Sequence, residues 1–229
     1  MCSSDLGRPG GAGRGPRGAG RVEKGAEAGE LILLSQDEAR FPMVPTLCRT
    51  LGVKGRRPVV GTWDNKHLLH VFASVNVVTS RLHTKTVACR TGLFRRTGES
   101  KTRRLQRTFA CHLRQIAACY PAERYRRVVL VIDNAPWHAG EPVRRALAEH
   151  PHLELKRLPS YSPQLNVIER FWKVLRRRAT HNRLFDRLAD LKRSIRNSLC
   201  YFQTARGRAR SLVAKCYTRP ANRKASAGS

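Results

Sequence analysis

The segment VVLVIDNAPWH, from Val128 to His138, limits most strongly what this chain can fold into. Its first five residues are all valine, leucine or isoleucine, a composition typical of a strand buried on both faces of a sheet. The run ends on Asp133, where the backbone has to turn. Two explanations fit such an aspartate: it begins a turn, or a buried strand carries a catalytic group to the edge of a sheet.

The patterns on either side of this run predict an ordered series of elements. Short apolar or alternating runs indicate strands, and apolar residues at helical spacing indicate helices. The order strand-strand-strand-helix-strand-helix-strand-helix-helix predicts an α/β fold, a mixed five-stranded sheet flanked by helices. Strands are expected at residues 30–38, 66–77, 79–90, 126–133 and 153–159, and helices at 103–120, 141–150, 162–178 and 184–199.

The expected ends of the helices rest on local signals. Pro121 stops the first helix, and Ser162 with Pro163 begins the third, as an N-cap and a first helical residue. The last helix is expected to carry a leucine and isoleucine stripe that starts at Leu184. Residues 92–108 are strongly basic and are expected to form a loop.

The charge balance points to a polyanionic partner. The 229 residues include 45 Lys and Arg against 16 Asp and Glu, a net charge of +29. A surface this basic repels itself unless it meets a polyanion, and nucleic acid is the commonest one. A membrane protein is not favoured, because no run of about 18 apolar residues occurs and the N-terminus lacks the apolar stretch of a signal peptide.

The seven cysteines have neither CxxC nor zinc-finger spacing. They indicate reduced thiols in a cytoplasmic protein rather than a zinc site or a disulfide framework.

Composition also divides the chain. Residues 1–29 are rich in Gly, Arg and Ala and are expected to be disordered. They are either a flexible basic arm or a sequence artefact, because Cys-Ser-Ser-Asp-Leu is what a sequencing-adapter end would encode. Residues 30–204 are expected to form one domain, and 205–229 a basic flexible tail.

Acidic residues are scarce, so their positions carry information. Asp37 is expected to close the first strand and Asp133 the fourth, and Glu169 lies on the helix after the fifth strand. If the first and fourth strands are neighbours, the three carboxylates can meet at one end of the sheet. Three such groups repel one another unless divalent cations lie between them. Oxygen ligands select Mg²⁺ or Mn²⁺, and two such ions are a device for phosphoryl transfer.

Each of these residues also has a simpler interpretation. Asp37 fits an ordinary loop acid, with Glu38 or Asp64 as the real ligand, and Glu169 fits a solvated helix charge paired with a basic neighbour. His138 fits a general base, or a turn histidine packed near the tryptophan that precedes it. Spacing alone leaves these alternatives open.

The segments VVLVIDNAPWHAG and LPSYSPQLNVIERFWKVLRRR resemble the catalytic core of the DDE transposases, in particular the mariner-type group and its bacterial insertion-sequence relatives. The second and third acids are separated by 35 residues, close to the number usual in this group. LLSQDEARF resembles the segment with the first acid. On this resemblance Asp37, Asp133 and Glu169 match the metal-binding catalytic triad.

The resemblance implies an RNase H-like fold and two Mg²⁺ or Mn²⁺ ions. It also implies DNA cleavage by water, followed by strand transfer by the freed 3′-hydroxyl. The implied partners are transposon ends and target DNA, with a possible homodimer. The implied location is the bacterial cytoplasm, in association with the nucleoid.

The chain departs from the family at Gln164, where an acid is frequent, and at Val167, where a proline is frequent. Relatives also carry helix-turn-helix modules before the first acid, where this sequence has the segment 1–29. Two alternatives follow: a non-catalytic DNA-binding remnant of a transposase, or an endonuclease on the same fold that performs no strand transfer.

Overall fold

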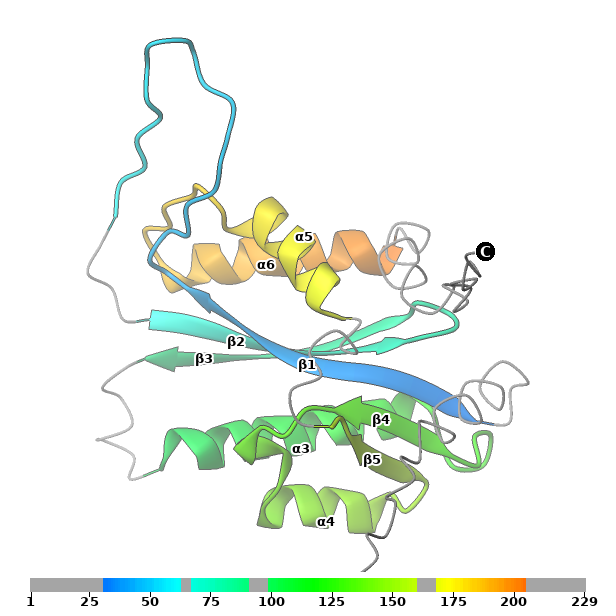
Figure 1. Cartoon of the computed structure of the whole chain (residues 1–229). Helices are drawn as coiled ribbons and strands as arrows, with labels where there is room; N and C mark the ends of the chain where they lie inside the picture. The colour runs from blue at the N-terminus through cyan, green and yellow to red at the C-terminus, as the bar shows by residue number, and fades with distance from the viewer. Residues whose placement is uncertain (1–30, 63–66, 91–98, 160–167, 205–229) are drawn as a thin grey trace, which may run out of the picture.

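The computed structural model describes residues 31–62, 67–90, 99–159 and 168–204 (Figure 1). The predictions for residues 1–29 and 205–229, the helix start at Ser162 and the candidate Asp64 lie outside these residues. The strands are β1 (Ile32–Pro42), β2 (His67–Asn76), β3 (Leu82–Arg90), β4 (Val128–Ile132) and β5 (Leu153–Arg157). The helices are α3 (Lys101–Cys119), the 3₁₀ turn η1 (Pro136–His138), α4 (Glu141–Glu149), α5 (Ile168–Ala179) and α6 (Leu188–Thr204).

The five strands form one mixed sheet in the order β3-β2-β1-β4-β5. β1 pairs antiparallel with β2 and parallel with β4, and β5 extends the parallel part. β2 and β3 are antiparallel neighbours, joined by a short turn. The predicted element order, the mixed sheet and the adjacency of the first and fourth strands are all confirmed.

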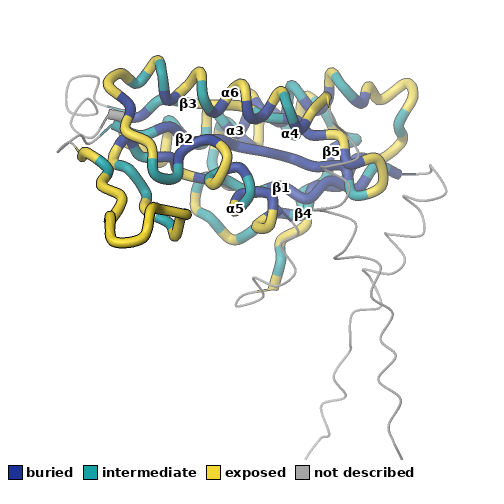
Figure 2. Tube along the Cα trace, turned by 90° about the horizontal axis from the view of Figure 1, so that it is seen from above, coloured by how far each residue is buried: buried dark blue, intermediate teal, exposed yellow. Residues whose placement is uncertain are grey.

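Helices cover both faces of the sheet. α5 and α6 lie on one face, and α3 and α4 lie on the other (Figure 1). Each face has its own apolar core, so the strands between them are mostly buried (Figure 2). β4 is covered on both faces, as its composition predicts, with four of its five residues buried. Within the described residues, no helix is long and apolar enough to cross a membrane.

Asp37 does not close its strand, contrary to the prediction. β1 continues to Pro42, and Asp37 pairs with Ala73 in the middle of the ladder with β2. The extension has a clear cause: Ala39 and Phe41 alternate onto the face covered by α5, where they are 2% and 1% exposed. The apolar alternation therefore outlasts the two acids, and β2 supplies a partner for the whole length.

The loop predicted at 92–108 overlaps the helix predicted at 103–120, and its last eight residues are helical. α3 begins at Lys101, because the Ser100 side chain accepts a hydrogen bond from the backbone N–H of Arg103 and caps the helix. Residues 91–98 lie outside the described part of the chain. The last helix begins later than expected: Leu184 precedes α6 and is 38% exposed.

A long connection, residues 43–62, leads from β1 towards β2 and projects away from the sheet (Figure 1). Its base is tied to the segment between α5 and α6 by Asn182, whose side chain accepts from the backbone N–H of Cys48 and donates to the Cys48 carbonyl oxygen, at 2.9 and 3.0 Å. Asn182 has a positive φ of 56°, a conformation that asparagine tolerates better than most residues.

Two buried histidines stand between α3 and the sheet. His112 is fully buried, and its Nε2 lies 2.8 Å from the hydroxyl of Ser74. His83 is buried beside Tyr120, with 3.1 Å between its Nε2 and the phenolic oxygen. Burial lowers the pKa of His112 to about 3 and that of His83 to about 4. Both histidines are therefore neutral in the folded protein at neutral pH.

These pKa values predict a loss of stability in acid. Below pH 6.5 the imidazole of His112 binds a proton in the unfolded chain but not in the folded one. The contribution of His112 to the free energy of unfolding is therefore present above pH 6.5 and is lost as the pH falls towards 3. His112→Gln is expected to remove about 2 kcal/mol of the decrease in unfolding free energy between pH 7.5 and pH 4.5. Urea unfolding at both pH values measures this. His150→Gln, on a partly exposed histidine after α4, is the matched control; an equal effect there would contradict the assignment.

Candidate functional site

Asp133 follows β4 directly and is held by the turn after it. Its Oδ1 accepts a hydrogen bond from the backbone N–H of Ala135 at 3.0 Å and lies 2.9 Å from Nδ1 of His138. The bond from His138 is the main reason why the pKa of Asp133 is lowered. Both donors reach the same oxygen, and among the described residues no hydrogen bond to Oδ2 is present. Asp133 therefore acts as a turn residue and as a fixed, ionised carboxylate.

His138 is buried behind this carboxylate. Its ring packs against Phe109 of α3, with 4.6 Å between ring centroids, and edge-on to Trp137 at 6.2 Å. Only 1% of its side chain is exposed. The packing expected for a turn histidine is present, and the contact with Asp133 adds a second role: it orients the acid.

Asp37 points from the middle of β1 towards α5. Its Oδ2 accepts a hydrogen bond from Nε1 of Trp172 at 3.0 Å. Burial raises the pKa of Asp37 to about 6, against the hydrogen bonds from Trp172 and from the backbone of Glu38. The charges of Asp133 and Glu169 raise it further. Asp37 therefore lies within electrostatic range of both of the other predicted site acids.

Glu38, the alternative first acid, points to the opposite face of the sheet. There its Oε1 contacts Nδ1 of His70 in a pair whose side chains are 5% and 1% exposed. Alternation along the strand separates neighbouring residues in this way. Glu38 is thus part of the α3 side of the molecule and does not share a face with Asp37.

Glu169 lies in the first turn of α5 and is exposed. A carboxylate is favourable there because the helix N-terminus carries a partial positive charge. Within the described residues it forms no ion pair, so the expected pairing with a basic neighbour on the same helix is absent.

β1, the end of β4 and the start of α5 thus bring three carboxylates into one region. Within the residues that the structure describes, no three His, Cys, Asp or Glu side chains are close enough to share one metal ion. The donor chemistry nevertheless fits hard divalent cations, because all three groups offer carboxylate oxygens. Burial is the main cause of the raised pKa of Asp37, and the charges of Asp133 and Glu169 add a lesser part.

Arginines border this region. The charge of Arg157, at the end of β5, helps to lower the pKa of Asp133. Arg176 of α5 lies over the ring of Phe41, 5.5 Å from its centroid, and interacts electrostatically with Asp37. Cations beside an acidic site are suited to hold phosphate groups next to it.

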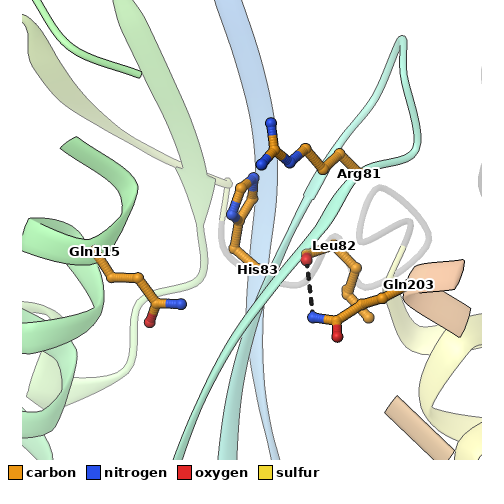
Figure 3. A pocket seen from close by; sticks show the side chains of 5 residues that line it. All are labelled: Arg81, Leu82, His83, Gln115 and Gln203. Carbon is orange, nitrogen blue, oxygen red and sulfur yellow. Dashed lines mark hydrogen bonds between the residues drawn. The ribbon is translucent and has the colours of Figure 1, made fainter. Parts of the chain in front are cut away.

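A separate cavity of about 270 Å³ lies at the β3 edge, two strands from β1 (Figure 3). It is lined by Arg81, His83, Gln115 and Gln203, and Nε2 of Gln203 donates to the Leu82 carbonyl oxygen across it at 3.2 Å. The lining residues that the structure describes include no carboxylate, and none of them is one of the three acids.

A match to a known protein family shows which class of protein this chain belongs to. The family model described as DDE superfamily endonuclease matches residues 33–192, which include all three acids. The chain belongs to this family.

Solved transposase structures share the fold. The catalytic domain of Mos1 mariner transposase has a TM-score of 0.52 at 16% identity, over 86% of this chain and 85% of that one. Mos1 transposase in a paired-end complex with the left transposon end gives 0.54 at 18% identity, over 86% of this chain and 57% of that one. A paired-end complex was also solved with Mn. The RNase H-like fold is confirmed.

A curated relative matches by sequence. The insertion element IS630 uncharacterized 39 kDa protein of Shigella sonnei is 29% identical over 100 residues, which are 44% of this chain. The matched region spans 28% of that relative's length. The chain is thus a DDE-family protein similar to a transposase catalytic domain.

Sequence reasoning missed the role of Trp172 in this region. Trp172 is 3% exposed and belongs to the apolar core on the α5 side of the sheet, and its indole N–H also donates to Asp37. One signal was available: Trp172 follows Glu169 by three residues, so the two lie near one another on the helix surface.

Trp172→Phe tests this hydrogen bond because it keeps an aromatic ring in the core. The variant is expected to lose about 1 kcal/mol of unfolding free energy and to bind Mn²⁺ about 10-fold or more weakly, the range typical of a residue that orients a ligand. Urea unfolding and a Mn²⁺ titration measure the two effects. Phe202→Leu, in the same core, is the control; weaker Mn²⁺ binding there too would assign the effect to general destabilisation.

Proposed function

We propose that the chain is the catalytic domain of a transposase, which cuts DNA at transposon ends and joins the freed end to target DNA with divalent cations bound at Asp37, Asp133 and Glu169. The observation that carries the proposal is the position of Asp37 within a DDE endonuclease family match. Asp37 lies on β1, beside the strand β4 that leads to Asp133, and is hydrogen-bonded to Trp172 of the helix that carries Glu169. Residues 30–204 form the proposed domain, with basic segments before and after it.

Protein groups hold two of the proposed ligands in place. Trp172 holds one oxygen of Asp37, and His138 holds one oxygen of Asp133. Each aspartate is thereby restricted to few rotamers, which lowers the entropy lost when it binds a ligand. Glu169 lies on a helix that packs on β1 through Trp172, so its backbone is fixed relative to Asp37.

The proposal includes two divalent ions, Mg²⁺ or Mn²⁺. When bound, they would activate the attacking oxygen and stabilise the leaving oxygen. In the first step water attacks a phosphodiester, the bond from phosphorus to the 3′-oxygen breaks, and a 3′-hydroxyl is released. In the second step this hydroxyl attacks a phosphodiester of the target and displaces its 3′-oxygen. Arg157 and Arg176 are suited to hold phosphates during both steps.

A two-part assay tests the proposal. The chain is incubated with supercoiled plasmid and Mg²⁺ or Mn²⁺, and separately with a pre-cut duplex that carries a free 3′-hydroxyl and a target plasmid. Nicking in the first reaction and covalent joining in the second are expected. Nicking without joining would favour the endonuclease alternative, and salt-sensitive binding without either reaction would favour the non-catalytic remnant.

A further inference from the structure

A basic groove lies where the edge strand β3 meets the first turns of α3. A groove of about 460 Å³ opens between these elements. Lys85 from β3 and Arg104 and Arg107 from α3 line it, together with Thr86 and Thr108. Glu99 is the one acid among the described lining residues, and it forms an ion pair with Arg107 at 3.1 Å. The described lining residues therefore carry a net positive charge.

This groove and the acidic region lie on opposite sides of the sheet. Lys85 is in register with Phe72, whose ring packs against Phe109 of α3. Asp37 instead points towards α5 through its bond to Trp172. A ligand in the groove is separated from the carboxylates by the sheet itself.

The charge at the start of α3 favours an anionic ligand. The first turn contains Lys101, Arg103 and Arg104 and no acid. Cations are unfavourable at a helix N-terminus, which is already partly positive. The positive charge at the start of α3 also acts on β3. Burial raises the pKa of the Cys89 thiol on β3, and the charges of Arg104 and Lys101 lower it. An anion in the groove would relieve this repulsion.

The side chains that line the groove indicate which kind of anion it can bind. Lysine, arginine and threonine side chains bind phosphate oxygens, whereas no aromatic side chain among the described lining residues offers a surface for a base. The groove is open along a sheet edge and stands in a protein with a net charge of +29. We propose that it holds the phosphodiester backbone of nucleic acid without reading its sequence, as a contact surface distinct from the carboxylates.

The proposal goes beyond the proposed function, because this contact requires no metal and no cleavage. All tests therefore use EDTA and a duplex of arbitrary sequence, so that failure of catalysis leaves them unaffected. The first compares K85Q/R107Q with K192Q/R196Q, which removes two exposed charges from α6 instead. Fluorescence anisotropy gives the slope of log affinity against log salt concentration.

Because each phosphate contact contributes about 0.9 to that slope, K85Q/R107Q is expected to reduce it by roughly 1.8. K192Q/R196Q is expected to leave it nearly unchanged. Equal reductions in both variants, or none in K85Q/R107Q, would overturn the proposal. Thermal melting confirms that both variants are folded.

The second test uses the unaltered protein. Cys111 lines the groove and is exposed, and Cys200 is exposed on α6, across the sheet. Duplex DNA is expected to slow alkylation of Cys111 by N-ethylmaleimide at least 5-fold and to leave Cys200 unaffected, as read by peptide mass spectrometry. Equal protection of both cysteines, or none of Cys111, would overturn the proposal.

Discussion

Replacement of Asp133 by asparagine is expected to lower metal-dependent plasmid nicking by more than about 100-fold, beyond the range typical of residues that only orient a metal ligand. The substitution is nearly isosteric. Its amide oxygen can still accept the hydrogen bonds from Ala135 and His138 that Oδ1 accepts in the native chain. The change is confined to the second oxygen, which becomes an amide N–H₂ and cannot bind a cation.

The control for this variant is Asp186→Asn, which removes the same charge from an exposed position between α5 and α6. Its nicking rate is expected to match that of the unaltered chain. Both variants are compared at equal protein concentration, with circular dichroism to verify folding. Equal nicking by Asp133→Asn and the native chain would contradict the assignment of Asp133.

The second large effect concerns stability. Phe109→Ala is expected to reduce the unfolding free energy by about 3–5 kcal/mol, because it removes a fully buried ring and leaves a cavity. The ring contacts Phe72 on β2 and His138 behind Asp133. The loss therefore also removes the support that holds His138 against the carboxylate.

Phe109→Leu separates the two consequences, because leucine fills most of the volume but offers no flat face to His138. We expect a smaller loss of stability, below about 2 kcal/mol, together with weaker Mn²⁺ binding. Urea unfolding gives the first quantity and calorimetry the second. A Phe109→Ala variant as stable as the native chain would contradict the packing described for α3.

The features of this fold that follow from local patterns could be predicted from the sequence. The uninterrupted apolar run of β4 predicts a strand buried on both faces, and the aspartate that follows it is fixed at the strand end by chain order alone. The helical stripe of α5 likewise predicts the element that carries Glu169. Such features depend on neighbours in the chain, which the sequence displays directly.

Features that depend on distant partners could not be predicted. The end of β1 depends on β2, which pairs with it as far as Pro42 and leaves Asp37 in mid-strand. The bond from Trp172 to Asp37 joins residues 135 positions apart. The contact of His138 with Phe109 depends on how α3 packs against the turn after β4. Tertiary packing, rather than local preference, decides these positions.

The most direct test of the central claim is calorimetric titration of Mn²⁺ into the native chain and into Asp37→Asn, Asp133→Asn and Glu169→Gln. This measurement is independent of DNA and of turnover. The account predicts that the native chain binds Mn²⁺, that each of the three variants binds it at least about 10-fold more weakly, and that Asp186→Asn binds it as the native chain does. Unchanged Mn²⁺ affinity in all three variants would contradict the account.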